Sequence, residues 1–242
     1  MGSVIASSVA SAAAINDPNV IRRFGNLTAL SASEMLLAAR AYVEQGAEAQ
    51  RSVASSSVQD KAGGSGAFAV RITYLTSAYV LKTEDVTLNG TTKVPTVATD
   101  IRFIEKFQVI QGAAAAGAIS LYNGTSGGAT EFVGIGVGTY DAFLCHHYVP
   151  AGKSGFVYGW SLSSDDEVKA KLMGRSLYGV NLVDEHWDLV NLMGITTPPG
   201  YLEFSKMLVG ASYGEKSYIR ITVVPNQATS TTIRGDLLLW ER

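Results

Sequence analysis

The sequence predicts an all-β protein: an antiparallel β-sandwich or jelly roll with an N-terminal arm that contains one α-helix. From residue 67 onward, apolar residues alternate with small or polar ones, and this period of two is typical of half-buried strands. Turn residues such as Asn89-Gly90 and Asn123-Gly124 separate the alternating runs, and Asn-Gly is a strong hairpin signal. Helical patterns do not alternate with these runs, so a doubly wound α/β fold is not expected.

The N-terminal arm is predicted to cover residues 1–60. It starts with an apolar run of small residues, MGSVIASSVASAAAIND, in which no Lys or Arg precedes Arg22. A secretory signal peptide needs a positive n-region, so secretion is not expected. A segment so rich in Ala, Ser and Val is too apolar for a solvated tail. We therefore expect the arm to lie on another subunit or on a neighbouring protein.

One helix is predicted within the arm, over about residues 32–50. Ser31 and Glu34 fit a capping box, and the apolar residues Met35, Leu36, Ala39 and Val43 fall near helical spacing. A Ser-rich linker, 52–57, follows the predicted helix.

The β-sandwich is predicted to occupy residues 61–242, with an insertion at about 165–200. Alternating runs at residues 68–74, 79–83 and 86–88 begin it. Further strands are expected at 101–110, 118–122, 132–137, 142–149, 156–162, 177–183, 218–224 and 231–240. The segment 184–193, DEHWDLVNLM, fits either a short helical turn or an irregular insertion.

Composition excludes several functional classes. The chain has 242 residues and a formal net charge of −2, so the basic footprint of a nucleic-acid-binding protein is absent. Its single cysteine, Cys145, excludes an internal disulfide framework and a multi-cysteine metal cage. Because no stretch of 18 apolar residues occurs, no membrane span is expected.

Three short motifs raise the question of bound phosphate or metal. Gly152-Lys153-Ser154 resembles the end of a phosphate-binding loop, but His147 stands where that loop needs its first Gly, and a strand follows. Cys145, His146 and His147 are potential metal ligands, yet a zinc site needs three or four ligands in suitable positions. We expect these histidines at the surface or at a subunit contact. Arg234-Gly235-Asp236 is interpreted as a bend entering the last strand.

Acidic clusters offer weak catalytic candidates. Asp184, Glu185 and Asp188 lie within five residues of one another, which favours a solvated turn over the two opposed carboxyl groups of a glycosidase. Residues 165–167, Asp-Asp-Glu, are interpreted as a charged hairpin tip. We assign no catalytic, metal-binding or cofactor-binding residue and predict no cofactor and no enzyme activity.

One region of the sequence indicates a function more specifically than the overall composition does. Residues 60–94 run from Asp60 through a Gly64-Ser65-Gly66-Ala67 turn to the sequence Glu84-Asp-Val-Thr-Leu-Asn-Gly-Thr-Thr-Lys-Val94. This region resembles a family of tailed-bacteriophage virion proteins. The resemblance also includes Val70, Leu75, Ile101, Arg102, Ile104, the Gly-rich segment 112–119 and the hairpin sequence YVPAGKSG at 148–155. The resemblance covers about residues 58–160.

The resemblance implies a jelly-roll capsid decoration, or cement, protein. Such a protein binds the major capsid protein and stabilises the phage head. Sandwich edges must be paired or covered, and a symmetric homotrimer is a natural way to do so; no nucleic-acid or membrane partner is expected. The protein would be made in the host cytoplasm and reside on the outer surface of the virion capsid.

A carbohydrate- or receptor-binding β-sandwich of a head fibre or tail is the alternative. It requires exposed aromatic residues at one end, with Trp160, Tyr178, Trp187 and Tyr201 as candidates. A glycan hydrolase that uses Asp184 and Asp188 is a third and weaker interpretation.

Overall fold

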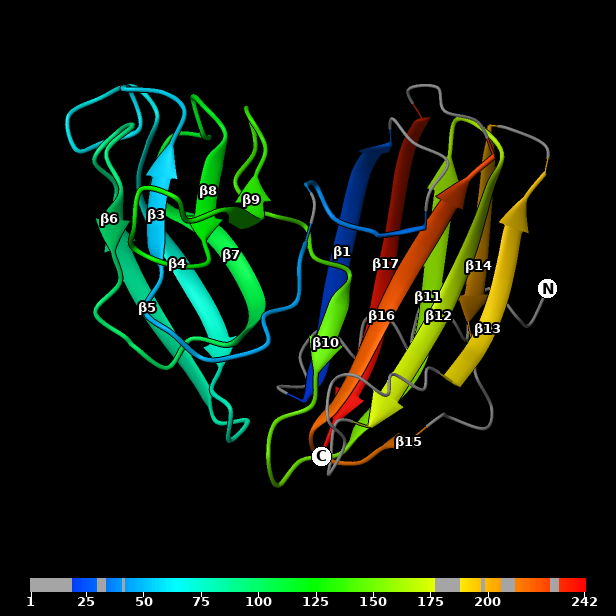
Figure 1. Ribbon diagram of the computed structural model, residues 1–242. Helices are drawn as coiled ribbons and strands as arrows, with labels where there is room; N and C mark the ends of the chain where they lie inside the picture. The colour runs from blue at the N-terminus through cyan, green and yellow to red at the C-terminus, as the bar shows by residue number, and fades with distance from the viewer. Residues whose placement is uncertain are drawn as a thin grey trace.

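The computed structural model describes residues 19–29, 34–40, 42–176, 188–196, 199–205, 212–226 and 231–242. These residues form antiparallel β-strands and no helix, which confirms the predicted all-β class. Figure 1 shows two groups of strands side by side, called here the first and the second sandwich. In the part of the chain that is described, no helix has the length and apolar character needed to cross a membrane.

The first sandwich contains two small sheets. One has the order β6 (Val94–Pro95), β3 (Ser52–Ser55), β8 (Ile119–Tyr122) and β9 (Glu131–Ile135). The other has the order β5 (Leu81–Thr87), β4 (Ala67–Leu75) and β7 (Phe103–Gly112). Inward-facing residues of both sheets share one apolar core that includes Val53, Leu121, Val70, Ile72 and Phe107.

The second sandwich contains two longer sheets. One has the order β1 (Val20–Ala29), β17 (Thr231–Glu241), β11 (Gly155–Ser164) and β14 (Gly200–Ser205), with β15 (Ser212–Tyr213) also paired to β11. The other has the order β10 (His146–Tyr148), β16 (Ser217–Pro225), β12 (Val168–Ser176) and β13 (Asp188–Ile195), with β2 (Met35–Leu36) on β16. Their shared core includes Trp160, Leu162, Leu237, Ala170 and Ile221.

Parts of the predicted arm belong to these sheets. β1 pairs with β17 along its whole length, from Val20 opposite Trp240 to Ala29 opposite Thr231. β3 lies between β6 and β8 in the first sandwich. Residues 1–18 lie outside the described residues, so the proposed docking role of the arm stays a prediction.

The helix predicted over residues 32–50 is wrong for its described residues, 34–40 and 42–50, here called the strap. The strap is an extended segment in which β2 pairs with β16, through Leu36 opposite Thr222. Its helix-forming residues make contacts with other strands instead: Glu34 pairs with Lys171 and Arg40 with Glu131. Most of the stability of a helix in a protein comes from tertiary packing rather than from local propensity, so these tertiary contacts override the local preference.

The predicted strands at 101–110, 156–162, 218–224 and 231–240 are confirmed as β7, β11, β16 and β17. The predicted Asn-Gly turns differ from each other. Asn123-Gly124 lies in the connection between the paired strands β8 and β9 and is a hairpin. Asn89-Gly90 is a tight turn, with Gly90 at a φ of 58°, but it joins β5 to β6 in the other sheet.

Part of the expected insertion at 165–200 is regular sheet. β12 lies between β16 and β13, so it completes the second sandwich. Residues 165–167 connect β11 of one sheet to β12 of the other, so the predicted hairpin tip is a crossing loop. The predicted strand at 177–183 lies outside the described residues.

Candidate functional site

The Cys145-His146-His147 segment lies inside the molecule, where β10 meets β7 of the first sandwich and β1 and β17 of the second. All three side chains are buried, so the expected surface position of the histidines is wrong. Burial raises the pKa of the Cys145 thiol, and its Sγ lies 3.6 Å from the carbonyl oxygen of Arg23. Among the described residues, no group of three or more His, Cys, Asp and Glu side chains could hold a metal ion.

A buried ionic network surrounds this segment, and we call it the junction cluster: Arg23, Glu105, His146, His147, Tyr148 and Glu241. The carboxylate of Glu105 on β7 accepts hydrogen bonds from the Arg23 guanidinium and the Tyr148 backbone N–H. His147 Nδ1 lies 3.1 Å from Glu105 Oε2, and its Nε2 lies 3.1 Å from Glu241 Oε2. The cluster therefore links β7 to β1, β10 and β17 through charged groups.

Electrostatics favours opposite protonation states for the two histidines. Burial alone would lower the pKa of His147, but Glu105 and Glu241 raise it above its ordinary value. Burial lowers the pKa of His146 to about 4, and its ring lies between the Ile104 carbonyl oxygen, at 2.7 Å, and the Tyr218 hydroxyl, at 3.0 Å. Burial also opposes the charge of Glu105, yet Arg23 and His147 outweigh it and lower that pKa to about 2.

Aromatic rings extend the contact between the sandwiches. Tyr148 of β10 stacks on Tyr218 of β16, with centroids 4.1 Å apart, and lies 4.7 Å from Phe103 of β7. The Tyr42 hydroxyl of the strap lies 2.9 Å from that of Tyr148. Because Phe103, Tyr148 and Tyr218 are buried and in ring contact, and Tyr42 is hydrogen-bonded to Tyr148, their arrangement suits a rigid joint.

The residues of the virion-protein resemblance form a frame around Asp60. This buried carboxylate accepts hydrogen bonds from the backbone N–H groups of Ala67, Ala116 and Gly117, at 2.8–2.9 Å, and from the Ser55 hydroxyl. A Cβ on Gly66 would approach Asp60 Oδ1 to 2.1 Å, which explains glycine there. Glu84 similarly accepts hydrogen bonds from the backbone N–H groups of Val97 and Ala98.

Other motifs of the sequence take structural places. Gly152-Lys153-Ser154 lies in the loop from β10 to β11, where Gly152 has a φ of 76° and its N–H donates to Glu215. Because β10 and β11 belong to different sheets, this loop is not a hairpin, and strand β11 follows it. Residues 184–187 lie outside the described residues, and Asp188 is described only as the first residue of β13.

Arg234-Gly235-Asp236 lies within β17 rather than at a bend, so that prediction is wrong. Arg234 pairs with Asn26 of β1 and Ser163 of β11, and Ser163 pairs with Tyr201 of β14. Paired residues point to the same face of a sheet, so these four side chains form one row on the outer face of the second sandwich. Among the four aromatic candidates, Tyr201 is 61% exposed and Trp160 is buried, whereas Tyr178 and Trp187 lie outside the described residues.

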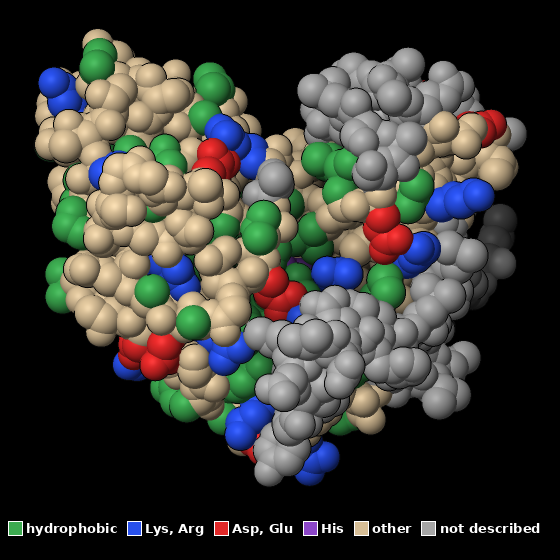
Figure 2. Space-filling view, viewed as in Figure 1, with side chains coloured by type: hydrophobic (Ala, Val, Ile, Leu, Met, Phe, Trp, Pro, Cys, Tyr) green, Lys and Arg blue, Asp and Glu red, His purple; other side chains and the backbone are tan. Residues whose placement is uncertain are grey.

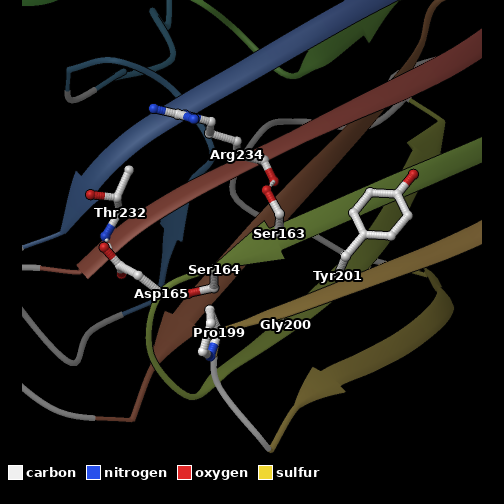
Figure 3. A pocket seen from close by; sticks show the side chains of 8 residues that line it. All are labelled: Ser163, Ser164, Asp165, Pro199, Gly200, Tyr201, Thr232 and Arg234. Atoms are coloured by element: carbon white, nitrogen blue, oxygen red, sulfur yellow. Dashed lines mark hydrogen bonds between the residues drawn. The ribbon is translucent and has the colours of Figure 1, made fainter.

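A groove lies along this outer face. One hollow of about 500 Å³ is lined by residues that include Ser163, Asp165, Tyr201 and Arg234, and Figure 3 shows the Ser163 side chain between those of Arg234 and Tyr201. A second hollow of about 300 Å³ shares Ser163 and Arg234 and continues to Phe24. In the sequence, Ser161 and Ser163 are two residues apart, as are Arg234 and Asp236, and this spacing indicates one polar face on each strand. Only the pairing of the strands shows that the two polar faces lie side by side.

Comparison with known proteins identifies no family. No protein-family model matches the chain, and no curated protein matches it. A solved structure of infectious bursal disease virus, Gt strain, matches with 10% sequence identity and a TM-score of 0.21, over 91% of this chain and 70% of that chain. A similarity this weak carries no argument about fold or function.

Proposed function

We propose that the chain is a structural virion protein, a capsid decoration protein that binds the major capsid protein and stabilises the phage head. The observation that carries the proposal is the frame around Asp60. There Asp60 accepts hydrogen bonds from the backbone N–H groups of Ala67, Ala116 and Gly117, and Gly66 packs closely against its carboxylate. That role suits a scaffold protein whose work is to hold a rigid shape.

The exposed apolar residues of the first sandwich and the strap support a role in adhesion. Of the exposed large hydrophobic residues described, Phe24 and Tyr201 lie in the groove, and the others lie between residues 43 and 140: Val43, Val58, Val80, Leu81, Val97, Ile110, Val137 and Tyr140. Figure 2 shows apolar side chains spread over the visible face of the first sandwich. Exposed apolar surface is a feature of interaction sites, so we assign part of the capsid contact to this sandwich, in addition to the contact expected of the N-terminal arm.

Two of these exposed residues, Val137 and Tyr140, lie in one segment beside the end of β7. The Val109 N–H donates to the Tyr140 carbonyl at 2.7 Å, and the Gly138 N–H donates to the Ala115 carbonyl at 2.8 Å. The first bond holds the segment that carries Val137 and Tyr140 against β7, and the second holds it against the loop that follows β7. The jelly-roll topology that the resemblance implies, and the homotrimer expected from the coverage of sheet edges, remain parts of this proposal.

Co-sedimentation with empty capsid shells of the corresponding phage tests the function. The full-length chain should bind the shells saturably, and deletion of residues 2–18 should abolish binding while leaving β1 and the melting temperature unchanged. Absence of binding by the full-length chain would contradict the decoration role. Binding by the truncated chain would instead assign the contact to the sandwiches alone.

Charged substitutions on the first sandwich locate the contact. Val137→Asp combined with Tyr140→Asp should weaken shell binding, because both side chains are more than half exposed and would bring charge into an apolar interface. Phe24→Asp, at an equally exposed site on the second sandwich, is the matched control and should bind normally. The opposite pattern would place the contact on the second sandwich.

A further inference from the structure

The outer face of the sheet β1-β17-β11-β14 carries two neighbouring rows of side chains that cross the strands. One row contains Asn26, Arg234, Ser163 and Tyr201, and the next contains Phe24, Asp236 and Ser161. With strands about 4.8 Å apart, the first row spans roughly 14 Å from β1 to β14. The two hollows described above lie over these rows and meet at Ser163 and Arg234.

The acidic side chains of the groove have ion-pair or hydrogen-bond partners, whereas its arginine, Arg234, has no acidic partner among the described residues. Arg22 Nε donates to Asp236 Oδ2 at 3.0 Å, and the Ser161 hydroxyl donates to Asp236 Oδ1 at 2.9 Å. Asp165 accepts the backbone N–H of Thr232 at 2.7 Å. Arg234 forms no ion pair with the described residues. It therefore offers a guanidinium, a rigid fork of N–H donors that matches a carboxylate.

Aromatic residues stand at both ends of the groove. Arg22 lies over the Phe24 ring, with its Cζ 4.6 Å from the ring centroid, so one face of that ring is covered. Tyr201 is 61% exposed at the other end. Between them stand Ser161 and Ser163, whose short side chains leave the surface low. Their hydroxyl protons are donated to Asp236 and to the Arg234 carbonyl, so their oxygens offer acceptor lone pairs to a ligand.

We propose that this groove binds an acidic oligosaccharide, with one sugar ring on Tyr201 and a sugar carboxylate on Arg234. Ligand sites combine apolar or aromatic surface with a few polar groups that fix orientation. Sugar rings present an apolar face and a rim of hydroxyl groups, which suit the Tyr201 ring and the serines. This binding site is separate from the capsid contact assigned to the first sandwich and does not depend on it.

Binding to an array of oligosaccharides that end in glucuronate, galacturonate or sialate tests the proposal, with their carboxyl-reduced counterparts as matched ligands. The full-length chain should bind carboxylated glycans, and carboxyl reduction should weaken binding about tenfold or more, because a hydrogen bond to a charged group is lost. Arg234→Gln should abolish the preference for the carboxylate, and Tyr201→Ala should weaken both forms.

Two variants on the first sandwich serve as controls. Arg71→Gln removes an exposed arginine and Tyr140→Ala an exposed tyrosine, both outside the groove, and both variants should bind as the wild type does. The proposal is overturned if no carboxylated glycan binds, if the reduced glycans bind equally, or if Tyr201→Ala and Arg234→Gln have no effect. A changed oligomeric mass of these two variants would identify the face as a contact between copies and would also overturn it.

Discussion

Two buried carboxylates, Asp60 and Glu105, hold together parts of the chain that are distant in sequence. Asp60 connects Ser55, Ala67 and the 116–117 segment. Glu105 connects β7 to Arg23 of β1 and to the β10 segment. A buried charge is tolerated only when its hydrogen-bonding capacity is satisfied, so both residues should be sensitive to small chemical changes.

Asp60→Asn is expected to lower the free energy of unfolding by about 2–4 kcal/mol, because one carboxylate oxygen becomes an NH₂ group that faces backbone N–H donors. Urea unfolding of the full-length chain measures the change. Asp85→Asn, which alters an exposed carboxylate paired with Arg71, is the control and should have little effect. An equal effect of the two substitutions would contradict the structural role of Asp60.

The two histidines predict how stability depends on pH. His146 stays neutral in the folded protein down to about pH 4, whereas the same side chain in the unfolded chain binds a proton near pH 6.5. The free energy of unfolding should therefore fall by roughly 3 kcal/mol as the pH is lowered from about 6.5 to about 4. The raised pKa of His147 stabilises the fold below pH 6.5, and that stability is lost as the pH rises through its folded pKa.

Urea unfolding from about pH 4 to about pH 9 measures both effects as slopes. His146→Gln should flatten the acidic side of the profile, and His147→Gln should flatten the alkaline side. Using slopes keeps the test valid even if a substitution lowers stability at every pH. Profiles that keep the wild-type slopes would show that other groups control the titration.

At the scale of elements, the strap depends on two glycines that face each other on β1 and β17. Gly25 pairs with Gly235, and Leu37 of the strap lies over both. A Cβ on Gly25 would come within 2.4 Å of Leu37 Cγ, and a Cβ on Gly235 within 2.9 Å of Leu37 Cδ2. Leu37 itself is fully buried, so the glycines create the space that anchors the strap.

Gly25→Ala should therefore destabilise the protein by about 1–3 kcal/mol through overpacking. Thermal or urea unfolding measures the change. Gly46→Ala is the matched control within the strap, because a Cβ there meets no atom within 4 Å, and it should be neutral or slightly stabilising. A neutral Gly25→Ala would show that Leu37 can move without cost.

At the scale of the whole molecule, the junction cluster and the strap connect the two sandwiches. The strap pairs with β16 through β2, and Ala38 belongs to the core of the first sandwich while Leu37 belongs to that of the second. In the proposed trimer, this connection would hold the first sandwich of each subunit against its own second sandwich.

Light scattering of the purified chain tests the oligomeric state. A trimer of the 25.6 kDa chain should give a mass of about 77 kDa, as expected for a symmetric decoration protein. The same measurement on Val137→Asp combined with Tyr140→Asp shows whether the first sandwich also forms the subunit contact. A stable monomer at all concentrations would contradict the trimer in solution.

The sequence by itself determined the all-β class and the positions of several long strands, among them β7, β11, β16 and β17, but not those of β1 and β12. Alternation with a period of two is a local property, and burial of one face of a sheet makes it visible in β4, β7 and β16. The turn at Asn89-Gly90 was likewise predictable, because a positive φ favours glycine.

Only the tertiary structure decided the strap, the junction cluster and the groove. Residues 34–50 have helical preferences, but pairing with β16 and the contacts of Glu34, Arg40 and Tyr42 outweigh them. The burial of His146 and His147 depends on Glu105 and Arg23, which lie at least 40 residues away in the sequence. The row from Asn26 to Tyr201 depends on the register of four strands, because a shift of one residue would turn every side chain to the opposite face.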